Sequence, residues 1–391
     1  MKSICVAEKE PTKLSMWNNL RRKLINFSRF DRLWIVLILA TLFFSIAARF
    51  TINMVLSGDE PHYLVMVNSL ITDHDLNLKN DYEQHKYSAF YNRELDPHIN
   101  WTLVDRSGNH WYSIHGVGLP LLILPSILIN DSIGAPLTMI GVGLLAIVSG
   151  VMLSKLVAGH ILSFFAGIMM SLSIPFLALT GYIFPDMVIG ALLAAIFVLM
   201  CRGRKSLLRE AIIGVLAAVL IWIHVKTGLI AGTIILIEVI EILRSFSGNT
   251  ERRHRLVSLL VPFVLISVCL QFKLTQWFGV LTPSGIYEGT NQIFQLSPLK
   301  VLLASVFDPY KGLLILSPIW FCAVIGFPEW YRRSKKQLLL VLILVIPSLL
   351  VQSTNQDWSG GWAPPSRYIA EYLPILLPAL ALGLEVMLSN T

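Results

Sequence analysis

The sequence predicts an all-α protein that crosses a membrane about ten times, and three observations lead to this fold class. Of the 391 residues, 55% are hydrophobic and only 14% are charged, whereas soluble domains carry about 25% charged residues. The mean hydropathy is +0.66, and apolar runs close to the roughly 20 residues that cross a bilayer recur along the chain. The Lys and Arg residues fall in short clusters between these runs, as in cytoplasmic loops. The net charge of +7 therefore reflects membrane orientation, and nucleic acid is not an expected partner.

Apolar segments of suitable length define the expected spans. They are residues 33–54, 136–154, 161–180, 186–201, 208–223, 227–243, 256–277, 312–330, 337–351 and 368–387. Residues 1–32 contain eight Lys and Arg residues and are expected to form a basic cytoplasmic tail. Residues 33–391 are expected to form one domain, because no internal repeat or low-complexity tract divides them.

A further apolar stretch, residues 117–130, is not expected to cross. It is short and contains Pro120 and Pro125. If it crossed, every later loop would change sides, including the basic clusters at 202–209, 244–255 and 332–336. The preference of cytoplasmic loops for Lys and Arg disfavours that arrangement. We therefore expect an interfacial or re-entrant helix here, with both termini in the cytoplasm.

Polar residues on the expected extracytoplasmic side mark a candidate site. The loop 55–116 is expected to form interfacial helices, and it opens with Gly58-Asp59-Glu60-Pro61-His62-Tyr63. Charges beside a bilayer are costly, so two adjacent acids there indicate a function. Further polar residues on this side are candidates for substrate binding, namely His62, Tyr63, Asp81, Tyr82, His115, His224, Asp308 and Tyr368.

The remaining polar residues suit the transfer of a sugar from a lipid phosphate. A carboxylate at the interface can have a raised pKa and act as a general base on a hydroxyl. The candidate catalytic carboxylates are Asp59, Glu60 and Asp186. Cations can hold a phosphate and stabilise the charge that develops on it as it leaves. The candidate ligands of the donor phosphate are Lys226, Arg367 and Lys311.

Each of these assignments has a structural alternative. Asp59 and Asp186 could cap the helices that follow them. Lys226 and Arg367 could extend toward lipid headgroups, and His224 could be a structural hydrogen-bond partner. These alternatives stay open at the level of sequence, as does the choice between Asp59 and its neighbour as the base.

A divalent cation is a candidate cofactor. His62 is within reach of Asp59 and Glu60, and carboxylate oxygens are common ligands of divalent ions. Asp59, Glu60 and His62 are therefore the candidate metal ligands. The sequence does not complete a ligand set, so no cofactor is assigned.

The acidic pair at the start of a large first loop resembles the GT-C superfamily of polyprenyl-phosphate-dependent glycosyltransferases, which includes the protein O-mannosyltransferases and the aminoarabinose transferases. The resemblance consists of short motifs over roughly residues 33–387. The segment 58–63 is similar to the first acidic motif of the family, which implies that Asp59 is the base. Phe184-Pro185-Asp186 is similar to the second acidic motif, and His115–Pro125 to the short helix after the loop. The resemblance also implies that Arg367 meets the donor phosphate.

The expected function is that of an integral-membrane inverting glycosyltransferase. It would move a sugar from a polyprenyl-phosphate donor to a hydroxyl acceptor on a lipid, glycan or protein, among membrane lipids. The expected location is the bacterial inner (plasma) membrane, with the active site facing the periplasm or exterior. A flippase or transporter of lipid-linked sugar and a polymerase or ligase of surface glycans remain alternatives. A transporter would place ionisable residues at mid-bilayer, whereas the charges here gather on one side.

Overall fold

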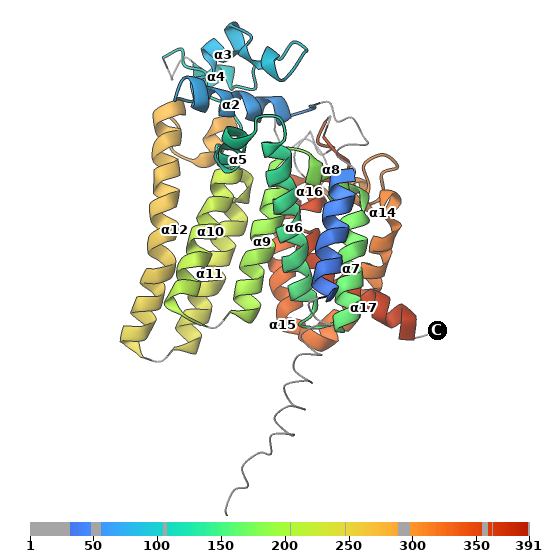
Figure 1. Cartoon of the computed structure of the whole chain (residues 1–391). Helices are drawn as coiled ribbons and strands as arrows, with labels where there is room; N and C mark the ends of the chain where they lie inside the picture. The colour runs from blue at the N-terminus through green and yellow to red at the C-terminus, as the bar shows by residue number, and fades with distance from the viewer. Residues whose placement is uncertain are drawn as a thin grey trace, which may run out of the picture.

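Figure 1 shows the computed structural model of the chain. The structure describes residues 32–47, 56–104, 108–203, 205–246, 248–287, 298–353, 359–361 and 363–389. Within these residues it consists of α-helices, short 3-10 helices and one isolated β-bridge between Ile99 and Ser113. The expected basic tail lies outside the described residues, apart from Arg32.

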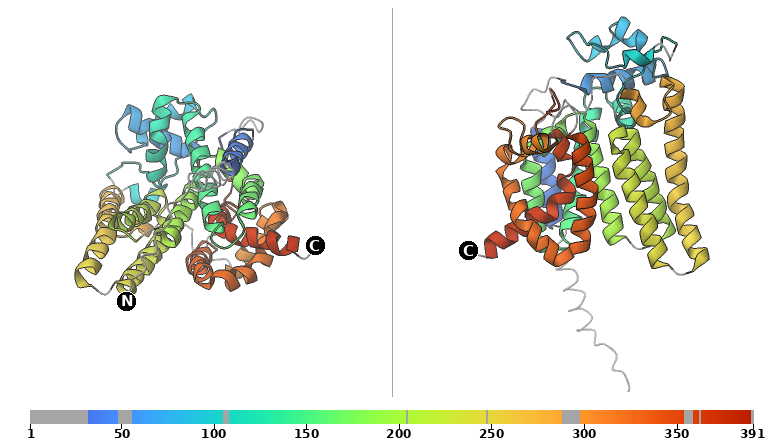
Figure 2. Two further views of the ribbon diagram at one scale, coloured as in Figure 1. Left: turned by 60° about the horizontal axis from the view of Figure 1, so that its bottom comes forward. Right: turned by 180° about the vertical axis from the view of Figure 1, so that it is seen from behind.

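The helices that form the bundle run roughly side by side (Figure 1). They are Arg32–Ala47, α6 (Gly134–Ser154), α7 (His160–Leu172), α8 (Ile174–Gly181), α9 (Pro185–Arg202), α10 (Leu207–Ile223), α11 (Gly228–Ser245), α12 (Asn249–Phe278), α15 (Phe321–Gln352) and α17 (Leu373–Ser389). Helices α6 and α9 pack on each other at the centre. Helices α10, α11 and α12 lie on one side of them, and α7, α15 and α17 on the other (Figure 1, Figure 2).

The remaining helices have 13 residues or fewer. They are α2 (Glu60–Thr72), α3 (Lys79–Glu83), η1 (Lys86–Ala89), α4 (Trp101–Val104), α5 (Gly118–Ile129), η2 (Val225–Thr227), η3 (Pro283–Tyr287), α13 (Pro298–Phe307), α14 (Leu313–Leu316), η4 (Pro318–Trp320) and α16 (Arg367–Ala370). Helices α2 to α5 lie at the top of the bundle in Figure 1, which we call the site end. The expected interfacial segment 117–130 forms α5, whose 12 residues are too few to cross a bilayer.

The bundle has the surface of an integral membrane protein. Helix α12 has an apolar stretch with a mean hydropathy of 2.1, of which only 11% is buried inside the protein. An exposed apolar surface of this size is typical of a protein in contact with lipid. Among the described residues, four helices are long and apolar enough to cross a membrane, or five if the bent pair α7–α8 counts as one span. The predicted fold class is confirmed, and the number of ten spans stays a prediction.

One predicted span, residues 161–180, is broken rather than continuous. Helices α7 and α8 meet at Ser173 with a bend of 65°. Pro175 in the first turn of α8 has no N–H to continue the hydrogen-bond ladder. The Ser317 hydroxyl accepts the freed N–H of Ile174 at 2.9 Å, so the break is satisfied by a distant part of the chain.

Helix α15 consists of two helical segments, which we call its arms. Ser334 has non-helical backbone angles (φ −152°, ψ 76°) and divides it. Lys311, before the first arm, and Gln352, at the end of the second, both contact the segment 361–371. In contrast, Arg333 forms an ion pair near the C-terminal end of α17. The chain therefore reverses at Ser334, which agrees with the two predicted segments on either side of it.

Close packing between α15 and α17 depends on glycine. A Cβ at Gly383 would overlap the Cys322 carbonyl, and a Cβ at Gly326 would overlap the Ala379 carbonyl. We expect Gly383→Ala to push the two helices apart and to destabilise the fold by about 1–3 kcal/mol. The thermal unfolding midpoint of the detergent-purified protein measures this loss.

The matched control for this change is Gly232→Ala on α11. No described atom lies within 4 Å of a Cβ placed there. Ala also has the higher helix propensity, so the control should be neutral or slightly stabilising. Equal midpoints for Gly383→Ala and the control would contradict the close packing of α15 on α17.

Candidate functional site

A cavity of about 760 Å³ opens at the site end. Its wall comes from the start of α2, the loop that precedes α4, the turn between α10 and α11, the end of α15 and the start of α16. Seven residues selected from the sequence line it, namely Asp59, His62, His115, His224, Lys226, Arg367 and Tyr368. Residues separated by more than 300 positions in the chain therefore share one cavity.

Five charged side chains form a continuous chain of ion pairs at this cavity. Arg367 connects two carboxylates, with Nη1 at 3.0 Å from Asp59 Oδ2 and Nε at 2.6 Å from Asp186 Oδ2. Lys226 Nζ lies 2.9 Å from Asp186 Oδ1 and 3.0 Å from Glu371 Oε2. Asp186 and Glu371 are fully buried. The cations therefore point into the protein, and not toward lipid headgroups.

Aromatic rings support both cations. The Arg367 guanidinium lies 4.6 Å from the centre of the Phe184 ring and 5.4 Å from that of Tyr368. Lys226 Nζ lies 4.9 Å from the centre of the Tyr368 ring. Such contacts stabilise a cation through the negative face of the ring. Phe184 of the Phe-Pro-Asp motif and Tyr368 therefore help to position the two predicted phosphate ligands.

The turn that precedes Arg367 has an unusual backbone that orients this side chain. Gly360 and Gly361 have positive φ values of 74° and 55°, which glycine adopts without strain. Ser366 also has a positive φ, of 56°, and its hydroxyl donates to the Lys311 carbonyl at 2.7 Å. Lys311 Nζ in turn donates to the Ala363 carbonyl at 2.9 Å. Lys311, expected to bind phosphate, thus braces the turn that carries Arg367.

The capping alternatives for the two aspartates are not realised. Asp59 precedes α2, but its side chain makes no capping hydrogen bond and reaches Arg367 instead. Asp186 lies inside the first turn of α9, whose N-cap residue is Phe184. Both oxygens of Asp186 contact cations. The two aspartates belong to the ion-pair chain.

Glu60 points away from the cavity. It is fully buried, and its carboxylate accepts the backbone N–H of Ile183 at 2.9 Å and that of Ser57 at 3.0 Å. Glu60 therefore ties the start of α2 to the segment between α8 and α9. This position suits a structural role.

Glu60→Gln should reduce stability. The amide group of Gln would place an N–H donor where two backbone donors now meet a carboxylate, so one buried donor would lose its acceptor. That loss costs about 1–3 kcal/mol. The thermal unfolding midpoint measures it, with Glu83→Gln, at an exposed position of α3, as the control. An unchanged midpoint together with lost sugar transfer would instead identify Glu60 as the base.

Three histidines gather around Asp59. His98 Nδ1 and His115 Nε2 are 3.0 Å apart, and they lie 3.8 Å and 4.0 Å from Asp59 Oδ1. The His62 ring stacks on His98 with centres 3.6 Å apart, and His62 Nδ1 is 2.8 Å from the Tyr82 hydroxyl. Burial lowers the pKa of His115 to about 4, that of His62 to about 2, and also that of His98. All three rings are therefore uncharged at neutral pH.

The pKa of Asp59 is shifted in the direction opposite to the one expected from the sequence. Burial raises the pKa of this carboxyl, but the nearby charges of His115, Arg367 and His98 outweigh burial and hold the pKa below its ordinary range. Because the histidines are uncharged at neutral pH, Arg367 is the charge that acts there. The expectation of a raised pKa is therefore wrong for Asp59 while Arg367 is its partner.

Three other residues selected from the sequence do not line the cavity and contact other parts of the protein. Asp81 is fully buried and accepts from Asn68 at 3.3 Å. The ring of Tyr63, also buried, lies 5.0 Å from that of His115. Asp308 accepts the backbone N–H groups of Tyr310 and Lys311 at 2.8 Å and 2.9 Å and so shapes a turn.

His224 has both kinds of role. It lines the cavity, and its Nδ1 accepts the backbone N–H of Lys226 at 3.2 Å. This hydrogen bond orders the turn between α10 and α11 that presents Lys226.

Sequence reasoning missed two residues of the site. Glu371 contacts Lys226 and lies four residues after Arg367, a spacing at which helical side chains are neighbours; this spacing could have drawn attention to it. His98 reaches His115 only because the β-bridge between Ile99 and Ser113 brings two distant segments of the loop together. No local sequence pattern predicts that contact.

The fold is similar to solved structures of membrane glycosyltransferases. ArnT from Cupriavidus metallidurans in the apo state matches with a TM-score of 0.59 and 14% identity, over 90% of this chain and 59% of that one. The same protein bound to undecaprenyl phosphate matches with a TM-score of 0.59 and 15% identity, over 92% and 60%. AglB from Archaeoglobus fulgidus, an oligosaccharyltransferase in complex with an inhibitory peptide and a dolichol-phosphate, matches with 0.52 and 13%, over 91% and 50%.

ArnT and AglB are both GT-C polyprenyl-phosphate-dependent glycosyltransferases. These likenesses, all at 15% identity or less, confirm the predicted fold. This chain spans about half to three fifths of the length of these proteins. No protein-family model and no curated protein sequence matches it.

Proposed function

We propose that this protein is an inverting glycosyltransferase that uses a polyprenyl-phosphate sugar and glycosylates a hydroxyl acceptor. The observation that carries the proposal is the ion-pair chain at the cavity, in which a carboxylate, Asp59, lies 3.0 Å from a cation, Arg367. We further propose that the site end faces the periplasm or exterior of a bacterial inner membrane, with both termini in the cytoplasm.

The ion-pair chain explains how a donor phosphate would activate the base. Arg367 and Lys226 offer charge-assisted donors that suit a phosphate. A phosphate that takes over Nη1 of Arg367 releases Oδ2 of Asp59 from its ion pair. Asp59 then loses the charge that holds its pKa down, and becomes a stronger base at the moment the donor is bound.

The reaction that follows is a single displacement. Asp59 accepts the proton of the acceptor hydroxyl, and the hydroxyl oxygen attacks the anomeric carbon from the face opposite the phosphate. The bond between that carbon and the phosphate oxygen breaks, and its electron pair stays on the phosphate. Arg367 and Lys226 stabilise the negative charge of the departing lipid phosphate.

Asp186 and Glu371 act as positioning residues in this scheme. Each contacts Lys226, at 2.9 Å and 3.0 Å respectively, and neither needs to touch the substrate. Two buried carboxylates on one ammonium keep Lys226 charged and fix its direction. The ion-pair chain already contains three carboxylates and only two cations. A donor phosphate must therefore displace one of the carboxylates, and Asp59 is the most exposed of the three.

A transporter is the main competing function. The buried ion pair of Arg209 with Glu238, at 2.8 Å, joins the first turn of α10, at the end of that helix far from the cavity, to the eleventh of the 18 residues of α11. The five charges of the ion-pair chain instead gather at the site end, whereas a transporter would place its ionisable site at mid-bilayer.

An assay with labelled donor distinguishes these functions. Membranes that contain the protein, and membranes that lack it, are incubated with undecaprenyl phosphate that carries a labelled sugar. A transferase releases undecaprenyl phosphate and moves the label into a new product. A polymerase or ligase moves the label into long glycan. Movement of intact labelled lipid across sealed vesicles, without a new glycosidic bond, would contradict the proposal.

A further inference from the structure

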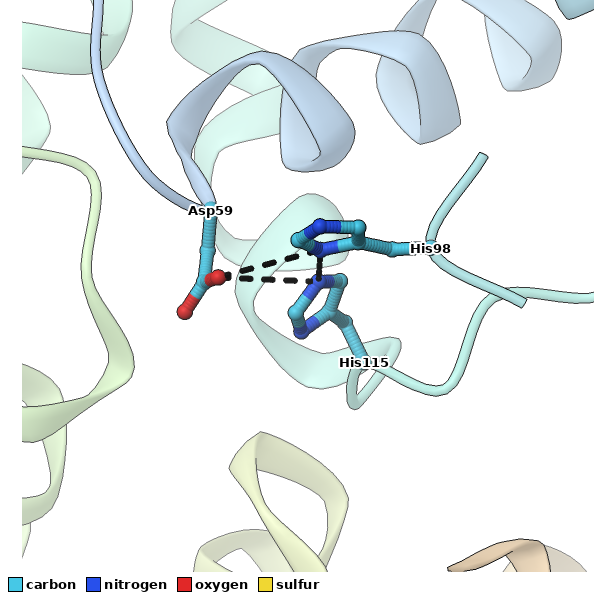
Figure 3. Close-up of side chains that lie close together, drawn as sticks. All are labelled: Asp59, His98 and His115. Atoms are coloured by element: carbon cyan, nitrogen blue, oxygen red, sulfur yellow. Dashed lines mark hydrogen bonds and ion pairs between the residues drawn. The ribbon is translucent and has the colours of Figure 1, made fainter. Parts of the chain in front are cut away.

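We propose that Asp59, His98 and His115 form a binding site for one divalent transition-metal ion of the Zn²⁺ class at the wall of the cavity. Figure 3 shows the three side chains pointing toward one another. Their ligand atoms, Asp59 Oδ1, His98 Nδ1 and His115 Nε2, all lie within 4.8 Å of one another. The site stands on this geometry, whether or not the chain transfers sugar.

The spacing of the three atoms fits a metal ion. Bonds from Zn²⁺ to nitrogen and oxygen of about 2.0–2.2 Å place neighbouring ligand atoms of a tetrahedral site about 3.4 Å apart. The observed separations are 3.0 Å between the two imidazoles and 3.8 Å and 4.0 Å to the carboxylate. Small side-chain rotations bring all three to bonding distance.

The backbone holds the two imidazoles side by side. Ile99 and Ser113 form the β-bridge, and the next residue, Ile114, donates its N–H to the His98 carbonyl at 3.1 Å. The N–H of His115 donates to the Ser113 hydroxyl at 3.1 Å. A site of pre-positioned ligands loses little freedom when the ion binds.

Glycine packing secures the same segment against the bundle. Gly116 follows His115 directly, and Gly118 is the first residue of α5. A Cβ at Gly118 would come within 2.7 Å of backbone atoms of Trp222 and Ile223 at the end of α10. The start of α5 therefore packs closely against the end of α10, next to the turn that carries Lys226.

The surroundings support ligation by these residues. Arg367 donates to Asp59 Oδ2 at 3.0 Å, so the other oxygen, Oδ1, faces the histidines. His62 stacks on His98 with an interplanar angle of 15° and is itself held by Tyr82. Such outer contacts orient metal ligands.

The donor set selects the class of ion. Two imidazoles and one carboxylate suit Zn²⁺, whereas Mg²⁺ and Ca²⁺ prefer oxygen ligands throughout. Three protein ligands leave at least one coordination position open. Because all three residues line the cavity, that position can take an oxygen from water or from a substrate.

This ligand set differs from the one expected from sequence. Of the expected metal ligands Asp59, Glu60 and His62, only Asp59 takes part. Glu60 accepts two backbone N–H groups, and His62 Nδ1 contacts the Tyr82 hydroxyl. Asp186 is occupied by Lys226 and Arg367, so it does not complete the site.

Metal titration tests the site directly. The full chain, purified without an oligohistidine tag and stripped with a chelator, is titrated with ZnCl₂ by calorimetry and with CoCl₂ by visible absorption. We expect one Zn²⁺ per chain and a Co²⁺ spectrum typical of four- or five-coordinate nitrogen and oxygen ligation. His98→Ala and His115→Ala should each weaken binding at least about 100-fold.

The control variant is His74→Asn. His74 is exposed at the end of α2 with a φ of 58°, a conformation that Asn tolerates, and it should leave binding unchanged. His98→Gln, at a side chain that is 40% exposed, is the second variant if His98→Ala fails to fold. Equal Zn²⁺ binding by the wild type and by the His98→Ala, His115→Ala double variant would overturn the site, as would absence of one-to-one binding by the wild type. Neither readout involves sugar transfer, so failure here is distinct from failure of the proposed function.

Discussion

Asp59→Asn is expected to abolish sugar transfer and to leave the protein folded in the membrane. Loss of a general base lowers the rate by about 10²–10⁴-fold. The Asn side chain has nearly the same shape, so the start of α2 should persist. Arg367 also keeps its second partner, Asp186, at 2.6 Å. The expected effect therefore lies in the chemical step rather than in folding.

The measurement is the initial rate of sugar transfer per folded protein, with the thermal unfolding midpoint recorded for each variant. Asp131→Asn, at an exposed position in the turn between α5 and α6, is the matched control and should transfer at the wild-type rate. Transfer by Asp59→Asn at the wild-type rate would remove Asp59 as the base. If Glu60→Gln lost transfer with an unchanged midpoint, the role would pass to Glu60.

Arg367→Lys is expected to reduce transfer by at least about 100-fold, the effect of losing one donor that stabilises transition-state charge. The substitution keeps the positive charge but loses the planar fork. Arg367 uses that fork to reach Asp59 with Nη1 and Asp186 with Nε, and one ammonium cannot reproduce both contacts together with those to a phosphate. Because the charge is retained, the buried carboxylates keep a counterion and the fold should survive.

Binding of undecaprenyl phosphate to the purified protein separates the two contributions of Arg367. The affinity should fall along with the transfer rate if this side chain contacts the phosphate. Arg333→Lys, at an exposed ion pair with Glu385 at 2.7 Å, is the control and should bind the lipid normally. Unchanged affinity and transfer in Arg367→Lys would show that the phosphate binds elsewhere.

Composition and charge pattern were sufficient for the fold class. The expected segments 186–201 and 208–223 coincide with α9 and α10, because a helix across a bilayer needs only local sequence, namely a run of apolar residues that satisfies its own backbone. The same reasoning separated the short segment 117–130 from the spans. It did not predict the break at Ser173, since the acceptor of the freed N–H is the distant Ser317.

The candidate site was predicted in part. Asp59, Asp186, Lys226 and Arg367 were selected because charges at the ends of membrane helices are costly unless they pair, and the structure brings all four together. Their partner Glu371 was missed, because it sits within an apolar stretch and only the fold shows that Lys226 faces it.

By itself, the sequence determined the helical membrane fold and the acidic motif at the start of the first loop, because both are local patterns. Only the tertiary structure shows which partners the adjacent residues Asp59 and Glu60 have. Successive positions at the start of a helix point about 100° apart, so the first carboxylate meets Arg367 while the second meets the amides of Ser57 and Ile183. The pairing of Asp59 with His98 and His115 likewise arises from a β-bridge between distant parts of the loop, and contacts between distant segments leave no local pattern.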